Sequence, residues 1–380
     1  MPEPFKNRFS KLLIEQMAAC FSQHYCDFDE RAFISKASAN LSNLELKQRI
    51  MQIVEAMREC LPEDFTRCGD ILHNSLRPMV NVNELSKDPS HARLIAGWAI
   101  MPMADFVGIY GQSHFEYSLT LLRAMTQRFS AEFAIRYFLD AKPQQTLAVL
   151  ETWLEDESEH VRRLVSEGTR PRLPWGMQLK QFVADPQALL PLLETLKDDS
   201  SEYVRRSVAN NLNDIAKDHP ALVVKICQRW LRGSTHNRTR LIKHACRTLF
   251  KQGRPDALDL FGFKSPKLSA CDLSLDSKVV TIGEAIEMRI ELSASSNKSK
   301  QASQKMMLDY AVYHQKANGS LVPKVFKWKQ FKLIQGESLQ LSKKHSFKSV
   351  TTRKYYAGAH KITVLINGHE LSECSFHLVE

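Results

Sequence analysis

The spacing of apolar residues divides the chain into two parts. From about residue 5 to residue 260, apolar positions recur every three or four residues, which predicts amphipathic helices. After the segment SPKLSA (265–270) apolar and polar positions alternate, and Asn-Gly and Gln-Gly pairs mark turns. Several short strands in about 110 residues predict a small antiparallel β-sandwich of immunoglobulin-like size. We expect its strands within 278–292, 307–314 and 360–366.

The helical part contains an imperfect repeat. In residues 147–168 and 189–212, an apolar residue (Trp153 or Leu196) precedes the valine of a Val-Arg-Arg triplet by eight positions. Residues 223–249 form a third copy, in which Gly-Ser-Thr-His-Asn-Arg replaces an acidic turn. Helix pairs that recur at about 34 to 43 residues predict a HEAT-like α-α superhelical solenoid. The alternative is an irregular helical bundle.

The two patterns together predict a multidomain α plus β protein. We expect a HEAT-like repeat domain over residues 1–264, a linker over 265–270 and an immunoglobulin-like β-sandwich over 271–380.

The second helix of the first copy carries charges of both signs on one side. Arg163, Glu167 and Arg170 follow each other at i, i+4 and i+7, which places a carboxylate between two guanidiniums on an exposed face if the helix extends that far. Two prolines then end the helix and place Trp175 just beyond it. A solvated ladder of salt bridges is the alternative. The second copy stacks Arg206, Asn210 and Asp214 in a similar way.

The composition is that of a globular protein with a basic surplus. Apolar residues make up 43% and charged residues 25%, while 52 Lys and Arg exceed 42 Asp and Glu. Nine Lys or Arg and no acid occupy Lys225 to Arg254. A basic stripe without acids indicates a polyanionic partner, most commonly a phosphate backbone, with a solvated basic helix as the alternative. Helical spacing places Arg240, Lys243, His244, Arg247 and Lys251 on one face.

The predicted sandwich is also basic. Thirteen Lys or Arg lie between Lys300 and Lys361, where the only acids are Asp309 and Glu337. In VFKWKQFKL (325–333) aromatic residues alternate with lysines, so that one face of a strand can pack while the other contacts phosphates. An ordinary amphipathic strand is the alternative. We expect the sandwich to contact a phosphate backbone.

Other features of the sequence exclude several classes of protein. The first residues lack the apolar core of a signal peptide, and the most apolar stretch, 94–104, is too short to span a membrane. The eight cysteines contain no Cys-x2-Cys pair, which argues against a zinc site or a disulfide framework. We therefore expect reduced, buried thiols in a cytoplasmic protein with no metal and no organic cofactor. The lack of a sustained heptad pattern favours a monomer.

Four segments resemble the AlkC branch of the AlkC/AlkD DNA glycosylases. They are SAEFAIRYF (130–138), HVRRLVSEGTRPRLPW (160–175), VRRSVANNLNDIAKDHP (204–220) and RLIKHACRTLFKQGRPDAL (240–258). The resemblance covers about residues 5–265, and the sandwich resembles the immunoglobulin-like domain of some AlkC proteins. It implies a base excision repair enzyme that wraps HEAT-like repeats around duplex DNA. Such an enzyme removes cationic alkylated bases, such as 3-methyladenine and 3-methylcytosine, without full base flipping.

The resemblance also implies roles for individual residues. It places the active-site acids at Glu167, Asp214 and Glu132, and Glu167 is the first choice for positioning the water. It implies double-stranded DNA with alkylated bases as the partner, and hence association with the nucleoid. A Trp followed four positions later by Asp, as in AlkD, is not found here. The resemblance also places four residues beside the damaged base: Phe133, Arg163, Arg170 and Trp175.

Carboxylates suit the implied chemistry. A cationic base is already a good leaving group, so no strong general acid is required. A carboxylate can stabilise the oxocarbenium-like sugar and position the attacking water. An acid within a surface that binds phosphates lowers the affinity for DNA, so its presence there indicates a function. A non-catalytic HEAT-repeat binding or scaffold protein and a solenoid enzyme acting on RNA are the alternatives.

Overall fold

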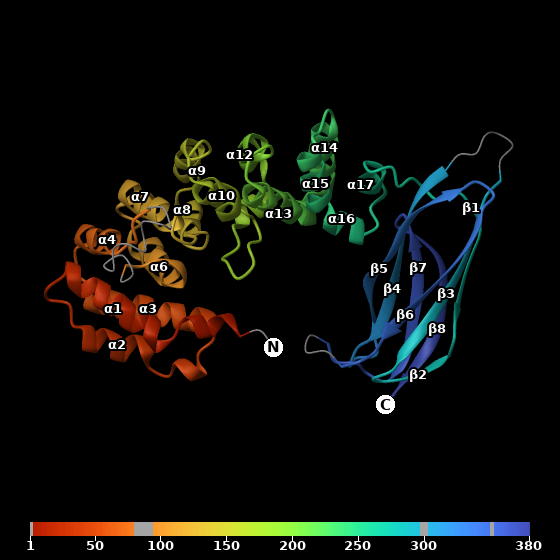
Figure 1. The fold of residues 1–380 in the computed structure, drawn as a ribbon, viewed down its shortest axis with the longest axis horizontal. Helices are drawn as coiled ribbons and strands as arrows, with labels where there is room; N and C mark the ends of the chain where they lie inside the picture. The colour runs from red at the N-terminus through yellow and green to blue at the C-terminus, as the bar shows by residue number, and fades with distance from the viewer. Residues whose placement is uncertain (1–2, 80–93, 297–302, 350–352) are drawn as a thin grey trace. The chain divides into compact units, whose positions relative to one another are not determined.

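The computed structural model describes residues 3–79, 94–296, 303–349 and 353–380, and the chain forms two compact units (Figure 1). The first unit is Met1–Asp218 with Ser234–Ala245, and the second is His219–Gly233 with Cys246–Glu380. The expected boundaries (1–264, 265–270 and 271–380) differ from this division, because short helices between 219 and 264 lie in the second unit.

The first unit is helical throughout its described residues. Short 3-10 helices accompany the α-helices at Phe5–Arg8 (η1), Leu41–Asn43 (η2), Gly97–Ala99 (η4) and Gln187–Leu189 (η5). The α-helices are α1 (Lys11–His24), α2 (Glu30–Ser38), α3 (Leu46–Cys60), α4 (Phe65–Asn74), α6 (Ile100–Tyr110), α7 (Phe115–Thr126), α8 (Ile135–Ala141), α9 (Pro143–Thr152), α10 (Glu159–Gly168), α11 (Lys180–Ala184), α12 (Leu190–Leu196), α13 (Glu202–Asp218) and α15 (His236–Ala245).

Local sequence explains where several of these helices begin. The side chains of Ser10, Asp29 and Asp64 accept hydrogen bonds from main-chain N–H groups in the first turns of α1, α2 and α4. Such caps satisfy N–H groups that have no partner within the helix. Pro143 begins α9, where its missing N–H is not needed.

The predicted repeat is confirmed in detail by the first two copies. They form the pairs α9–α10 and α12–α13, and Trp153 and Leu196 are both buried. In each copy the first arginine of the triplet donates to two carbonyl oxygens of its own acidic turn. Arg162 Nη1 contacts Asp156 O at 2.7 Å and Glu157 O at 3.1 Å, and Arg205 Nη1 contacts Asp199 O and Ser200 O. Arg162 also forms a bidentate pair with Asp199, which links one copy to the next.

No helix in the described part of the chain is long and apolar enough to cross a membrane. All eight cysteines are free, but only Cys20, Cys68, Cys227 and Cys246 are buried. The expectation that all the thiols are buried is therefore wrong for the other four: Cys60, Cys271 and Cys374 lie on partly exposed faces of their elements, and Cys26 is exposed in the turn between α1 and α2.

The second unit combines three helices with the β-sandwich. The helices are α14 (Pro220–Leu231), α16 (Arg247–Lys251) and α17 (Pro255–Asp259). One sheet has the order β1-β3-β6 and the other β2-β8-β7-β4-β5. The strands are β1 (Leu268–Leu275), β2 (Val279–Thr281), β3 (Ala285–Ala294), β4 (Ser303–Gln315), β5 (Leu321–Ile334), β6 (Ser338–Ser346), β7 (Gly358–Ile366) and β8 (His369–Val379).

The sandwich is confirmed, with one correction to its strand directions. The pair β2–β8 is parallel, whereas every other pair in the two sheets is antiparallel. The reason is a change of sheet: the chain turns at Gly283, with φ of 106°, and continues as β3 in the opposite sheet. The alternation in VFKWKQFKL is also confirmed, because Phe326, Trp328 and Phe331 are half-buried while the lysines between them are exposed.

The turn between β7 and β8 packs against the helical segment of the same unit. Asn367 and Gly368 both have positive φ, 49° and 82°, as a tight hairpin turn requires. Gly368 also lies so close to Gly253 that a Cβ on Gly368 would lie 2.2 Å from Gly253 O. Asn367 Nδ2 donates to Lys264 O at 2.7 Å and to Lys305 O at 2.9 Å. The Asn-Gly turn therefore joins the sandwich to the chain that precedes it.

Two buried histidines make the stability of the sandwich depend on pH. His314 Nε2 accepts a hydrogen bond from Arg353 at 2.8 Å, and His345 Nδ1 pairs with Tyr310 Oη at 3.0 Å. Burial, assisted by the charge of Arg353, lowers the pKa of His314 to about 3 and that of His345 to about 4. Both side chains are therefore neutral in the folded protein throughout the range in which an unfolded histidine becomes protonated.

We predict that the His345→Gln variant gains stability relative to the wild type as the pH falls. Below pH 6.5 the unfolded wild type takes up a proton that its folded form rejects, and this disadvantage grows until the folded pKa is reached. Relative to the variant, the wild type loses about 2 kcal/mol between pH 7 and pH 5. Urea denaturation of both proteins at the two pH values measures the difference. The comparison cancels the opposing contribution of Asp309, whose pKa burial raises to about 6. An unchanged difference contradicts the prediction.

Candidate active site

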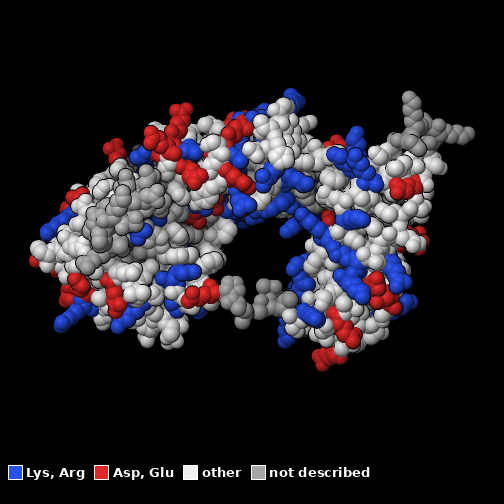
Figure 2. All heavy atoms as spheres, viewed as in Figure 1, with Lys and Arg blue, Asp and Glu red and all other residues white. Residues whose placement is uncertain are grey.

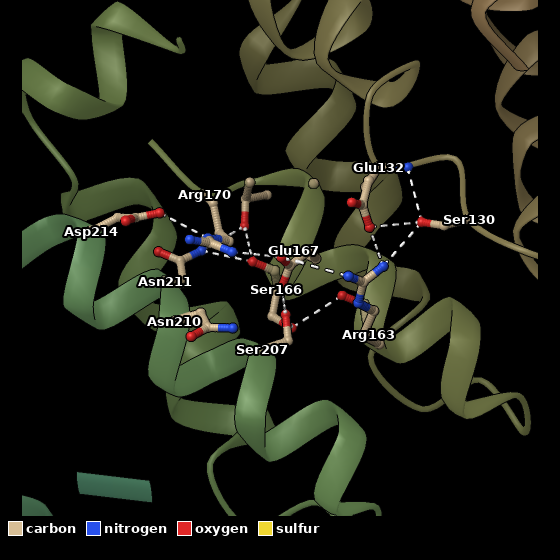
Figure 3. Close-up of polar contacts among 12 residues, drawn as sticks. Ser130, Glu132, Arg163, Ser166, Glu167, Arg170, Ser207, Asn210, Asn211 and Asp214 are labelled. Carbon is tan, nitrogen blue, oxygen red and sulfur yellow. Dashed lines mark hydrogen bonds and ion pairs between the residues drawn. The ribbon is translucent and has the colours of Figure 1, made fainter. Parts of the chain in front are cut away.

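Carboxylates and guanidiniums alternate in one row across the first unit (Figure 3). Arg163 and Glu167 lie on α10, and Asp214 lies on α13, which packs against α10. Glu132 lies in the turn before α8, and Arg170 lies in the turn after α10. The row thus joins residues from three separate parts of the sequence.

Glu167 is the centre of this row. Its Oε1 accepts from Arg170 Nη1 at 2.6 Å and lies 3.5 Å from Arg163 Nη2. Its Oε2 accepts from Ser207 Oγ at 2.6 Å. The residue is only 5% exposed. Glu167 therefore bridges two guanidiniums within the protein.

Asp214 is still more enclosed, at 1% exposure. Arg170 Nε donates to Asp214 Oδ2 at 2.8 Å, and Lys217 Nζ donates to Asp214 Oδ1 at 2.8 Å. Arg170 is thus the cation shared by two buried carboxylates. Removal of Arg170 would leave both of them without a major part of their compensation.

Glu132 is the most open of the three acids. Its Oε2 accepts from Ser130 Oγ at 2.9 Å and from Arg163 Nη1, and its side chain is 17% exposed. It borders a hollow of about 440 Å³ that is also lined by Arg128, Arg163 and Tyr203. The guanidinium of Arg163 lies over the ring of Tyr203, 5.1 Å from its centroid. Glu132 therefore offers a carboxylate to a molecule in this hollow.

Attraction to neighbouring carboxylates keeps the guanidiniums of Arg163 and Arg170 charged. Burial acts to lower the pKa of Arg163, but the Glu132 and Glu167 carboxylates outweigh burial and raise this pKa above its ordinary value. For Arg170, burial is likewise outweighed by Asp214 and Glu167, so that its pKa is also raised. The row contains three carboxylates and two guanidiniums, with Lys217 at its edge.

The structure corrects two expectations about this face. The helix α10 ends at Gly168, so Arg170 follows the helix instead of continuing its i, i+4, i+7 row. Glu167, Arg170 and Asp214 are buried, whereas the sequence predicted an exposed polar face. The reason is that α13 packs across the polar side of α10 and encloses the charges between the two helices.

The two aromatic residues expected near the lesion differ in their surroundings. Trp175 is 65% exposed, and its φ of 62° is unusual for a residue other than glycine. Its ring has an edge contact with Phe5 in η1, at 6.2 Å between centroids. Phe133 is covered on one face by Lys47, whose Nζ lies 3.9 Å from the ring centroid. Trp175 is therefore the more accessible of the two rings.

Basic side chains gather over α13 and α15, whereas acidic ones lie over α9 (Figure 2). Arg206, Arg240 and His244 line a hollow of about 130 Å³ between α13 and α15, together with Glu202, Arg205 and Asn237. Lys243 is exposed on α15. The expectation that Arg247 and Lys251 continue this helix is wrong, because α15 ends at Ala245 and α16 begins at Arg247 in the second unit.

Three residues of this region lie outside the set predicted from the sequence. Ser207 binds Glu167, Phe5 contacts Trp175, and Arg136 lies behind the turn that carries Arg170. Ser207 occupies a core position between Val204 and Val208, and Arg136 interrupts an apolar run, so a polar residue at a buried position was the available signal. Nothing in the sequence near Phe5 indicates its contact.

One family model and two full-length relatives identify the family of the chain. Residues 269–380 match a family model described as the C-terminal Ig-like domain of the uncharacterised protein YhaZ. Uncharacterised protein YhaZ of Bacillus subtilis (strain 168) is 36% identical over 376 residues, which are 98% of this chain and 99% of that protein. The structure of Pseudomonas fluorescens alkylpurine DNA glycosylase AlkC, bound to DNA containing an abasic site analog, is 35% identical with a TM-score of 0.86. The match covers 100% of both chains. The chain belongs to the AlkC family.

Membership of the AlkC family confirms the resemblance carried by the four sequence segments. It also confirms the order of the architecture, a helical part followed by an immunoglobulin-like domain. Among the residues that the structure describes, no group of three or more His, Cys, Asp or Glu residues could hold a metal ion.

Proposed function

We propose that this protein is a monofunctional DNA glycosylase. It hydrolyses the N-glycosidic bond of cationic N-alkylated bases, 3-methyladenine and 3-methylcytosine, in duplex DNA without full base flipping. One observation carries the proposal: three carboxylates, Glu132, Glu167 and Asp214, are held in one row and Glu132 borders a hollow, in a chain that otherwise has a basic surplus. The AlkC relative, an alkylpurine DNA glycosylase that was solved with DNA, supports the same reaction class.

A row of fixed carboxylates suits a reaction that passes through cations. The alkylated base is positively charged before the bond breaks, and the sugar acquires positive charge as the base leaves. In a partly enclosed site with fixed charges, a carboxylate stabilises that developing charge more strongly than water does. The sequence favoured Glu167 for positioning the water, but Glu167 is buried whereas Glu132 borders the hollow. We therefore assign to Glu132 the role of holding the attacking water and accepting its proton. The buried Glu167 and Asp214 add negative charge and fix Arg163 and Arg170.

Basic surfaces of the two units would hold the DNA backbone. Arg206, Arg240, Lys243 and His244 lie on or beside the hollow of α13 and α15. Exposed lysines lie along the edge strand β5. Where Figure 1 draws β5, Figure 2 shows a group of blue side chains. Arg247 and Lys251 add positive charge on the second unit. These contacts position the duplex without reading its sequence.

A matched pair of lesions tests the charge argument. We predict that the wild type releases 3-methyladenine from duplex DNA, but releases 3-deaza-3-methyladenine, a neutral base of the same shape, at least about a hundredfold more slowly. Single-turnover assays on two oligonucleotides that differ only in this base measure the rates. Equal rates contradict the proposal that the reaction requires a cationic base.

Two further substrates separate the alternatives. We expect release of 3-methylcytosine from duplex DNA and little release from the matching RNA. Tight DNA binding with no release of any base would instead support a non-catalytic scaffold protein.

A further inference from the structure

Arg136 is a buried cation next to the site, and the proposed mechanism assigns it no role. It is the second residue of α8 and has the largest side chain among the fully buried residues of the described ranges. Its Nη1 donates to Gly168 O and to Arg170 O, both at 2.7 Å, and its Nε donates to Met177 O at 2.7 Å. Its Nη2 also contacts Met177 O. One guanidinium thus binds three main-chain carbonyls of a single segment.

An arginine is an unfavourable choice for a position that needs only to be filled. Burial lowers the pKa of Arg136 to about 10, so the side chain is still charged at neutral pH. A buried charge loses its hydration, and an apolar residue of similar volume avoids that loss. The three carbonyls therefore indicate the purpose of the charge. Gly168 ends α10, so its main-chain oxygen has no partner within the helix, and Arg170 and Met177 lie in the loop that follows.

The segment that Arg136 holds, 168–177, carries two residues of the site. The main-chain oxygen of Arg170 is bound by Arg136, while the side chain of Arg170 joins Glu167 to Asp214. Trp175 lies between the anchored residues Arg170 and Met177 and has an unfavourable positive φ. Such a conformation persists only where the surroundings impose it. Two further hydrogen bonds, from Gly176 N to Leu173 O and from Leu179 N to Pro171 O, complete the turn.

We propose that Arg136 is a positioning residue of the glycosylase site. It clamps both ends of segment 168–177, so that the Arg170 guanidinium and the Trp175 ring have their working positions before DNA binds. The inference rests on the proposed function and adds a residue to it. If it is correct, the effect of Arg136 on base release passes through Trp175 and Arg170, and does not arise from a general loss of stability.

The test compares Arg136→Met and Arg136→Lys with a core variant of similar thermal stability. Phe33→Leu in α2 is the control, because Phe33 is fully buried against Phe21 and Phe28 and contacts no residue of the row. We expect Arg136→Met to lower the single-turnover release of 3-methyladenine roughly tenfold to a hundredfold, since small misplacements of site residues have effects of this size. Arg136→Lys keeps the charge but not the fork of donors, so its loss should be smaller. The control should release base at the wild-type rate.

A double-mutant cycle with Trp175→Ala separates positioning from stability. Without Trp175, Arg136→Met should have a clearly smaller effect, whereas independent changes would multiply. Amide hydrogen exchange of residues 168–179 should also be faster in both Arg136 variants than in Phe33→Leu. A wild-type rate in the Arg136 variants, or an equal loss on both backgrounds with unchanged exchange, overturns the proposal.

The two proposals fail in different ways. If the wild type releases no base, the glycosylase proposal fails, and exchange in segment 168–179 still decides whether Arg136 holds that segment. If Arg136→Met does not fold, Arg136→Lys carries the same comparisons.

Discussion

Replacement of Glu132 by Gln is expected to lower the single-turnover rate of 3-methyladenine release by roughly a hundredfold to a thousandfold. The change removes the most accessible negative charge of the site and leaves an amide, which cannot accept a proton from water. Affinity for DNA should fall little or rise slightly, because a negative charge near the phosphates is lost. The measurement is single-turnover release, together with a binding titration on undamaged duplex.

The unfolding temperatures of the two variants should distinguish the role of Glu132 from that of Glu167. Arg163 keeps Glu167 as a partner when Glu132 is replaced, so Glu132→Gln should unfold close to the wild-type temperature. Glu167→Gln should lose activity and also unfold at a lower temperature, because Glu167 bridges two buried guanidiniums. Glu15→Gln, in a half-exposed pair with Lys11 on α1, is the control for an ordinary loss of one carboxylate. A Glu132→Gln variant that releases base within about threefold of the wild type would show that another group positions the water.

The Arg170→Met variant is expected to be the least stable of the single substitutions considered. Glu167 and Asp214 would both lose the guanidinium that they share while remaining buried. Breaking a buried ion pair costs about 3–5 kcal/mol. Here two buried carboxylates each lose one cation, while Arg163 stays beside Glu167 and Lys217 stays beside Asp214. Base release should fall as well, since the arrangement of the row depends on this residue. Urea denaturation and the release assay measure the two effects.

Arg172, two residues after Arg170, provides a matched control. Arg172 forms a bidentate pair with Asp218 at 2.7 and 2.8 Å, but both side chains are partly exposed. Arg172→Met should therefore leave stability nearly unchanged. The double variant Arg170→Met, Asp214→Asn should recover part of the lost stability, because one of the stranded charges is neutralised. Equal stability of Arg170→Met and Arg172→Met would mean that the buried row has no structural importance.

Much of the fold could be predicted because the apolar pattern follows the packing. The Val-Arg-Arg repeat gives two equivalent helix pairs, and the Asn-Gly turn at 367–368 joins two strands of the sandwich as expected. Sheet assignment could not be predicted in the same way. Alternation specifies which face of β3 is buried, but not that the chain changes sheet between β2 and β3 or that β2 pairs with the parallel strand β8.

The charged residues of the site could be predicted from their spacing and from the family resemblance. Their burial could not. Periodicity within α10 cannot reveal that α13 covers the same face. The end of α10 at Gly168 was also hidden, since helical spacing continues through Arg170 in the sequence. Arg136 binds carbonyl oxygens that lie 32 to 41 residues further along the chain. Contacts of this kind leave no local pattern, and the only sign of them is a charge within an apolar run.

We propose that the row of acids on the helical unit breaks the bond between a cationic base and its sugar. If so, free 3-methyladenine and abasic sites should form together, and both can be counted in the same sample of methylated duplex DNA. The wild type and the Glu132→Gln, Asp214→Asn double variant are compared in this assay. We predict equal amounts of free base and abasic sites from the wild type, and neither above background from the variant. Release at the wild-type rate by the variant, or no release by the wild type, would contradict the claim.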